Sequence, residues 1–226
     1  VVEEPTPWHI LDIRDVLERE QVGQHEGLTD AEVEARRSTY GPNKLAEAKK
    51  ESGLRAFLRQ YADLMQIVLL VAAVLSIYPI NEYGTGLIIV ALTLVNAVIG
   101  LRQEGKAAAA VAALQNMMKI KATVLRNRRI VEVAAEELVP GDLVSIEAGD
   151  VVPADGRLLK AATLEVAESA LTGESLPVSK GIDSVSSPDT PLGDRSDMVY
   201  MNTSVTRGSG EFVVTATGMS TEVGHI

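Results

Sequence analysis

Two uncharged runs separated by a single glutamate constrain the fold of this chain more than any other feature. Residues 64–81 and 83–101 contain no Asp, Glu, Lys, Arg or His, and Glu82 lies between them. Each run is close to the ~20 residues that a helix needs to cross a bilayer core. Both are apolar around the whole helix, which is typical of a membrane or of a deep protein core. The pattern predicts a transmembrane helical hairpin. The alternative, a hairpin buried in a large soluble protein, would need more surrounding helix than this chain offers.

Basic residues around the two runs predict the orientation of the hairpin. Arg55 and Arg59 precede the first run, and the connection at residues 79–83 has no Lys or Arg. The basic residues after the second run are Arg102, Lys106, Lys119 and Lys121. The positive-inside rule therefore predicts a multi-pass membrane protein with both chain ends in the cytoplasm. The short connection requires antiparallel neighbouring helices, and Pro79 is expected to end or kink the first one.

Helix signals also occur before the hairpin. Thr6 and Pro7 suit the N-cap and the first position of one short helix. Thr29 and Glu32 form a capping-box pattern at the start of another, which Gly41 is expected to end. Two short N-terminal helices are therefore predicted.

The periodicity changes after the hairpin. The alanine-rich residues 102–118 are expected to continue the second membrane helix into the cytoplasm, and an alternating pattern follows. Three parts are therefore predicted: N-terminal helices that pack on a β-rich domain (1–55), the membrane hairpin with its cytoplasmic extension (56–118), and the β-rich domain itself (119–226).

Short strands and turns dominate the last part. Residues 120–135 read as two strands joined at Asn127. Further turns are predicted at Gly141–Asp142, Gly149–Asp150, Asp155–Gly156 and Gly208–Gly210. Many strands without a long helix between them indicate a small barrel or a jelly-roll-like sandwich. Residues 181–196 are rich in Ser, Pro, Asp and Gly, and a mobile loop is expected there.

Composition excludes several classes of function. A formal net charge of -10 without a basic stripe speaks against nucleic acid as a partner. The chain has no Cys, and its three His residues show no ligand spacing, so no metal site is predicted. Asp150 and Asp155 could form a glycosidase-like carboxylate pair, but turn acids explain them better.

The turn "LTGES" offers the clearest chemistry. Glu174 follows an apolar segment and has no His, Cys or Lys beside it in the sequence. Gly173 would let the backbone approach a ligand closely, and hydrogen bonds from Thr172 and Ser175 could orient the Glu174 carboxylate. Such a group could position a water molecule for attack on a phosphoryl or acyl group. A solvated turn glutamate remains the alternative from these residues alone.

Several segments together resemble the N-terminal part of the type II P-type cation-transporting ATPases, the group that includes calcium pumps. One is "ESALTGESLPVSK", which resembles the signature loop of the family almost residue for residue. The others are residues 27–45, 96–114, 139–159 and 199–226. The resemblance covers nearly the whole chain. It implies an α+β membrane protein, with a transmembrane helical hairpin, an all-β jelly-roll-like actuator domain and short N-terminal helices.

The resemblance also implies a role for each part. In these pumps the actuator domain rotates and brings its loop to an aspartyl-phosphate on a separate phosphorylation domain. Glu174 would position the water that hydrolyses this phosphoenzyme, while Thr172, Gly173 and Ser175 would shape the loop. The two membrane helices would act as gate and lever. The implied partners are the lipid bilayer, the remaining pump domains and the transported cation, with ATP and Mg²⁺ bound outside this chain.

Two departures limit these expectations. No Asp-Lys-Thr-Gly-Thr signature occurs in the sequence, so residues 1–226 alone are expected to be inactive. Ion specificity in the family resides largely in later helices. Calcium is favoured, although Ala62 stands before Asp63 where calcium pumps often have another acid. The alternatives are a sodium/potassium or proton pump of the same family, and a truncated membrane-anchored β-module without enzymatic activity.

Overall fold

The computed structural model describes residues 6–46, 52–78, 82–117 and 120–226. They fall into two compact units. The sheet unit comprises Val1–Ala46 and Lys119–Ile226, and the hairpin unit comprises Glu47–Met118. The sheet unit is therefore built from two separated stretches of the sequence.

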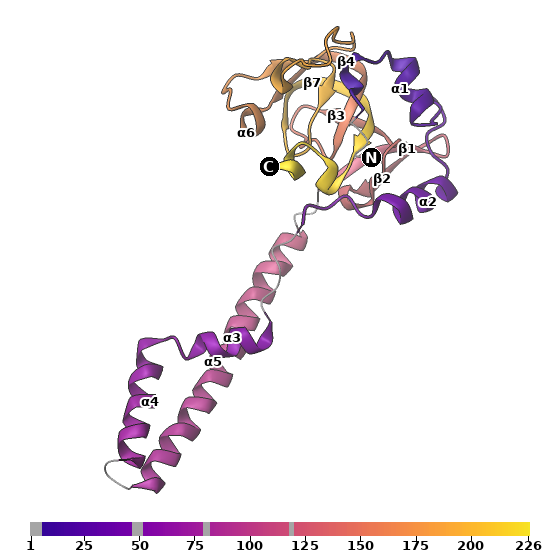
Figure 1. Ribbon diagram of the computed structural model, residues 1–226. Coiled ribbons are helices and arrows are strands. Elements are labelled where there is room, and N and C mark those ends of the chain that lie inside the picture. Colours follow the sequence, from indigo (N-terminus) through magenta and orange to yellow (C-terminus); the bar gives the residue numbers. More distant parts are fainter. Residues whose placement is uncertain (1–5, 47–51, 79–81, 118–119) are drawn as a thin grey trace. The chain divides into compact units, whose positions relative to one another are not determined.

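The hairpin unit contains the helices α3 (Gly53–Gln60), α4 (Leu64–Ile77) and α5 (Tyr83–Met117). Helices α4 and α5 pack side by side (Figure 1), and a Cβ at Gly86 would lie 2.3 Å from Ile77 Cγ1. The expected continuation of the second helix through the alanine-rich segment is confirmed by α5. The predicted effect of Pro79 lies outside the described residues.

The two apolar runs do not form equal helices. Over Tyr83–Val111, α5 is long and apolar enough to cross a membrane. In contrast, α4 has only 14 residues and meets the same criterion only when joined to α3, from which it is bent by 74°. Asp63 ends the break between them, because its carboxylate accepts a hydrogen bond from Met65 N at 2.9 Å and caps α4.

The sheet unit is built on one connected antiparallel sheet with the strand order β2-β1-β3-β7-β4-β5, and β6 also pairs with β4. Its strands are β1 (Lys121–Arg126), β2 (Arg129–Ala134), β3 (Leu143–Glu147), β4 (Asp155–Ala167), β5 (Val178–Ser179), β6 (Met198–Val199) and β7 (Ser204–Ala216). The jelly-roll arrangement remains a prediction. The turn between β1 and β2 is confirmed, since Asn127 and Arg128 have φ angles of 51° and 58°, as a tight hairpin turn requires.

Two of the predicted turns are wrong. Gly208–Gly210 lies inside β7, where Gly208 has a φ of 75° and a Cβ would come within 2.3 Å of Ala162 O. Glycine here permits a close approach beside an irregularity in the ladder between Ala162 and Glu165. Asp155–Gly156 likewise forms the start of β4 and not a turn. A glycine is needed at the second position because a Cβ there would lie 2.0 Å from Phe212 Cδ2. Both glycines serve packing inside long strands.

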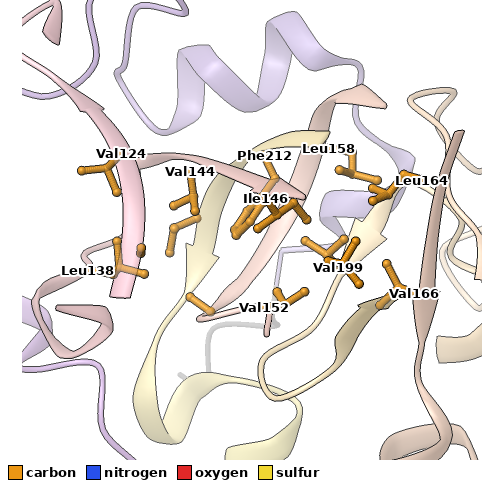
Figure 2. Close-up of a cluster of buried hydrophobic side chains, with 14 residues drawn as sticks. Val124, Leu138, Val144, Ile146, Val152, Leu158, Leu164, Val166, Val199 and Phe212 are labelled. Carbon is orange, nitrogen blue, oxygen red and sulfur yellow. The ribbon is translucent and has the colours of Figure 1, made fainter. Parts of the chain in front are cut away.

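Two apolar clusters hold the sheet unit together. The larger one gathers inward-facing side chains from most strands around Phe212, which is fully buried (Figure 2). The smaller one joins the N-terminal segment to the other side of the sheet. Its buried members are Val16, Val22, Leu28, Val139, Leu143, Leu159 and Val213.

Short helices surround the sheet: the α-helices α1 (Ile13–Arg19), α2 (Asp30–Tyr40) and α6 (Ser169–Thr172), and the 3-10 turns Trp8–Ile10, Ala135–Glu137, Leu192–Asp194, Gly218–Ser220 and Val223–His225. The capping box of Thr29 and Glu32 at the start of α2 is confirmed. The helix predicted from Pro7 is instead split into a 3-10 turn and α1. Leu11 and Asp12, between the two pieces, have extended backbones with ψ angles of 141° and 154°, so no continuous helix forms.

Residues 181–196 form the expected loop, but it is anchored. His9 Nε2 lies 3.2 Å from Ser187 O and 3.1 Å from Pro188 O. Arg157 donates a hydrogen bond to Ile182 O at 3.0 Å. These contacts restrict the motion that was expected of this loop.

Candidate functional site

The segment Thr172–Ser175 runs from the last residue of α6 into the exposed turn that leads to β5, in the orange part of the sheet unit in Figure 1. Gly173 ends α6 in the left-handed conformation, with a φ of 76°, and nothing lies within 4 Å of the position a Cβ would take. Glu174 and Ser175 are both exposed. The glycine therefore turns the backbone sharply and leaves the glutamate at the surface.

Thr172 organises the backbone of this turn. Its hydroxyl donates a hydrogen bond to Glu168 O at 3.2 Å and accepts one from Glu174 N at 3.2 Å. Thr172 thus contacts the main chain of Glu174. Among the described residues, neither Thr172 nor Ser175 makes a hydrogen bond to the Glu174 carboxylate. The expectation that these hydroxyls orient the carboxylate is therefore not met in this structure.

A buried ion pair lies at the base of the turn. Glu168 directly precedes α6, Lys180 directly follows β5, and Lys180 Nζ lies 2.5 Å from Glu168 Oε1. Both side chains are fully buried. Burial raises the pKa of Glu168, and the neighbouring Lys180 works against that rise. Burial likewise lowers the pKa of Lys180 against the effect of Glu168.

A second buried pair lies nearby. Arg157 Nε is 2.8 Å from Asp197 Oδ2, and both side chains are fully buried. The guanidinium also donates to the carbonyls of Leu158, Ile182 and Leu11 at 2.8, 3.0 and 3.2 Å. Arg157 therefore ties β4 to the 181–196 loop and to the N-terminal segment.

Sequence reasoning missed all four charged residues of these pairs. The sequence around Arg157 gave little signal, because the same strand also carries Asp155 and Lys160, and nothing local marks Arg157 as the buried charge. Its partner Asp197 lies far along the chain, and the sequence does not reveal that pairing.

Asp155 was predicted to be a turn acid, and this is wrong. Its side chain is buried, and its two carboxylate oxygens accept hydrogen bonds from Met201 N and Glu222 N, both at 2.7 Å. Burial raises its pKa to about 6. Asp150, in contrast, is exposed and accepts a hydrogen bond from Glu147 N at 2.9 Å, as a turn acid does. Asp155 therefore pins the C-terminal segment to the start of β4.

Other parts of the described chain offer less to a ligand. A hollow of about 730 Å³ lies over β1, β3, β4 and β7, and its lining does not include Thr172–Ser175. In the described ranges no group of three or more His, Asp or Glu side chains is placed to hold a metal ion. The exposed turn is the part of the sheet unit whose chemistry is most distinctive.

Comparison with known proteins gives two family matches. Residues 116–226 match the P-type ATPase actuator domain, and residues 8–76 match the N-terminus of cation transporters and ATPases. The candidate turn lies inside the first of these ranges.

Individual relatives point the same way. A calcium-transporting ATPase of Bacillus subtilis is 42% identical over 97% of this chain and 24% of its own length. A probable cation-transporting ATPase F of Mycobacterium tuberculosis is 41% identical over 98% of this chain and 24% of its own length. The cation-transporting ATPase pma1 of Synechocystis is 40% identical over 88% and 22%. The chain thus spans about a quarter of the length of the curated relatives it matches.

Proposed function

The chain belongs to the cation-transporting P-type ATPases, and from this premise we propose that it is the actuator and gate portion of an ATP-driven cation pump. Glu174 positions the water that hydrolyses an aspartyl-phosphate carried by another domain. The observation that carries the proposal is the exposed carboxylate of Glu174, presented on a left-handed turn above a buried charged base. A glutamate used only for solubility would not need this support.

The local geometry suits the proposed chemistry. The Glu174 carboxylate makes no hydrogen bond within the described chain, so its oxygens are free to accept one from a water molecule. Orienting that water and accepting its proton makes it a better nucleophile toward phosphorus. Gly173 has no side chain to hinder the approach of another domain. The other half of the active site is the phosphorylated aspartate, outside residues 1–226.

The hairpin unit has a separate part in the proposal. Most apolar side chains of α4 and α5 are exposed, including Leu64 at 76% and Leu87 at 70%, which a lipid bilayer would cover. We propose that these helices form the first membrane hairpin of the pump and follow the movement of the sheet unit. ATP and Mg²⁺ would bind elsewhere in the pump and supply the phosphoryl group and its charge neutralisation.

Calcium is the proposed ion. The support comes from the name of the Bacillus subtilis relative, a calcium-transporting ATPase, whereas other relatives are named only for cations. ATPase activity of the full-length protein, measured with calcium, sodium, potassium and different proton concentrations, tests this choice. Stimulation by sodium and potassium, or by protons alone, would identify the alternative pump types.

The substitution Glu174→Gln tests the mechanism in the full-length protein. Phosphoenzyme should still form from ATP but should decay about 10²–10⁴ times more slowly, because the amide cannot accept a proton from water. Radiolabelled phosphoenzyme followed after a chase with unlabelled ATP measures the decay. Glu147→Gln, at another exposed glutamate of the sheet unit, is the matched control and should decay normally. Unchanged decay in Glu174→Gln would remove this residue from the chemistry.

A further inference from the structure

We propose that Glu168 and Lys180 are positioning residues whose buried ion pair holds the Thr172–Ser175 turn in the geometry that hydrolysis needs. This inference rests on the function proposed above. It assigns a catalytic consequence to two residues whose side chains are fully buried.

The pair closes the base of the turn. Glu168 is the residue before α6, Lys180 is the residue after β5, and their side chains meet at 2.5 Å. Strand β5 has only two residues and pairs with β4 at Val166 and Glu165. So short a ladder gives the returning chain few backbone hydrogen bonds. The ion pair therefore supplies an important part of the connection between the two ends of the turn.

A short path of hydrogen bonds leads from the pair to Glu174. The carbonyl of Glu168 accepts hydrogen bonds from Thr172 N at 3.0 Å and Thr172 Oγ1 at 3.2 Å. Thr172 Oγ1 in turn accepts the hydrogen bond of Glu174 N at 3.2 Å. A shift of Glu168 would therefore move Thr172, and through it the backbone that carries the Glu174 carboxylate.

Lys180 is itself held in one orientation. Besides Glu168, its ammonium group donates a hydrogen bond to Arg195 O at 3.3 Å and lies 5.6 Å from the centre of the Tyr200 ring. These partners come from different segments around the turn. Lys180 therefore joins the base of the turn to the chain that runs into β6.

Stability alone does not account for burying these charges. Burial disfavours the charged form of both residues, and replacing a buried ion pair with apolar residues of similar volume is often neutral or stabilising. An apolar contact is not directional, whereas an ion pair with hydrogen bonds fixes the relative position of the two segments. Precise placement of Glu174 would explain why the base of the turn keeps a buried ion pair in place of an apolar contact.

Three variants of the full-length protein test the proposal: Lys180→Met, Glu168→Gln, and the double variant Glu168→Gln/Lys180→Met. The double variant leaves no unpaired buried charge, so its thermal unfolding temperature should stay close to that of the unmodified protein. Its phosphoenzyme should form normally yet decay roughly 10- to 100-fold more slowly, since small misplacement of a catalytic group has costs of that order. Lys160→Met, at a Lys–Glu pair of the same sheet whose lysine is exposed, is the matched control and should decay normally.

A cycle with Glu174→Gln separates positioning from general support of the fold. If the pair acts through Glu174, adding Glu168→Gln/Lys180→Met to Glu174→Gln should slow decay by less than 2-fold further, because the group being positioned is already disabled. Full additivity of the two effects would overturn the proposal. So would normal decay in the folded double variant.

The outcomes also distinguish this inference from the function on which it rests. Normal decay in Glu174→Gln alone would overturn the proposed function. Slow decay in Glu174→Gln combined with normal decay in the folded pair variants would overturn only the positioning role. If Lys180→Met does not fold, the double variant and Glu168→Gln still decide the question.

Discussion

The two units of this chain distribute charged and apolar side chains in opposite ways. The sheet unit buries Arg157, Asp197, Glu168 and Lys180 completely and covers most of its large apolar residues. The hairpin unit exposes its apolar residues, and within residues 52–78 and 82–111 no charged side chain is buried. The sheet unit thus has the buried core of a body surrounded by water, while the hairpin unit exposes an apolar surface that lipid would cover.

Whether an exposed apolar side chain stabilises or destabilises a unit depends on whether water or lipid surrounds that unit. Leu92 of α5 is 60% exposed and Ile130 of β2 is 75% exposed. In water, the exposure of either side chain would be mildly unfavourable. In a bilayer, the contact of Leu92 with lipid would be favourable, and a charged side chain in place of Leu92 would be costly. Replacing matched residues in the two units therefore tests whether water surrounds one unit and lipid the other.

The largest expected effect concerns a buried charge in the sheet unit. Arg157→Met leaves Asp197 buried without its partner, and we expect a loss of about 3–5 kcal/mol of unfolding free energy. Denaturant unfolding followed by the fluorescence of Trp8, the only tryptophan of the chain, reports on this unit. Arg128→Met removes an exposed pair with Glu26 and should change stability by less than about 1 kcal/mol. Equal effects at both sites would contradict the distinction drawn between buried and exposed pairs.

The next effect tests the solvent of the hairpin unit. Leu92→Arg should disfavour membrane insertion of α5 by about 2.5–3.5 kcal/mol if this helix spans a bilayer. A glycosylation-site reporter placed beyond the helix measures the inserted fraction. Ile130→Arg, at a similarly exposed apolar residue of the sheet unit, should change stability by only about 0.5 kcal/mol. Unaltered insertion of Leu92→Arg would show that α5 does not cross the lipid.

A smaller effect should appear in the pH dependence of the unfolding free energy of the sheet unit. Burial raises the pKa of Asp155 from 3.8 to about 6. The folded state therefore binds the proton more tightly than the unfolded state, and the free energy of unfolding should fall as pH rises from about 4 to 6. The contribution is less than about 3 kcal/mol, at roughly 1.4 kcal/mol for each pKa unit.

The variant Asp155→Asn isolates this contribution, because it has no group that titrates at this position. Its unfolding free energy, followed through Trp8, should depend less on pH across that window than that of the unmodified chain. Glu20 is buried beside Arg36, and burial raises its pKa to about 7. Its deprotonation should therefore lower the free energy of unfolding further at higher pH. A variant with the same slope between pH 4 and 6 would exclude Asp155 as a source.

Local signals predicted their elements well. The capping box of Thr29 and Glu32 and the tight turn at Asn127 each depend on a few neighbouring residues. Family resemblance carried the identification of the Thr172–Ser175 loop, since a tetrapeptide alone allowed a solvated turn. The long apolar run of α5 was equally clear, because helix length and composition are local properties.

Features that depend on distant partners could not be predicted. Gly208 and Gly156 look like turn residues in the sequence, yet they allow close approach between strands β4 and β7. The apolar run before Pro79 gave no sign of the 74° bend between α3 and α4. The buried ion pairs near the Thr172–Ser175 turn were missed for the same reason, since Glu168 and Lys180 are brought together by the pairing of β5 with β4.

The division of the sheet unit into two stretches of sequence has a consequence for the order of events during synthesis. Val16 and Leu28 leave the ribosome early, but they complete their apolar cluster with Leu143 and Val213, which follow the entire hairpin unit. Residues 6–46 therefore keep an unfinished apolar face while the hairpin unit is synthesised. This apolar face is therefore exposed in the growing chain until the strands that cover it have been made.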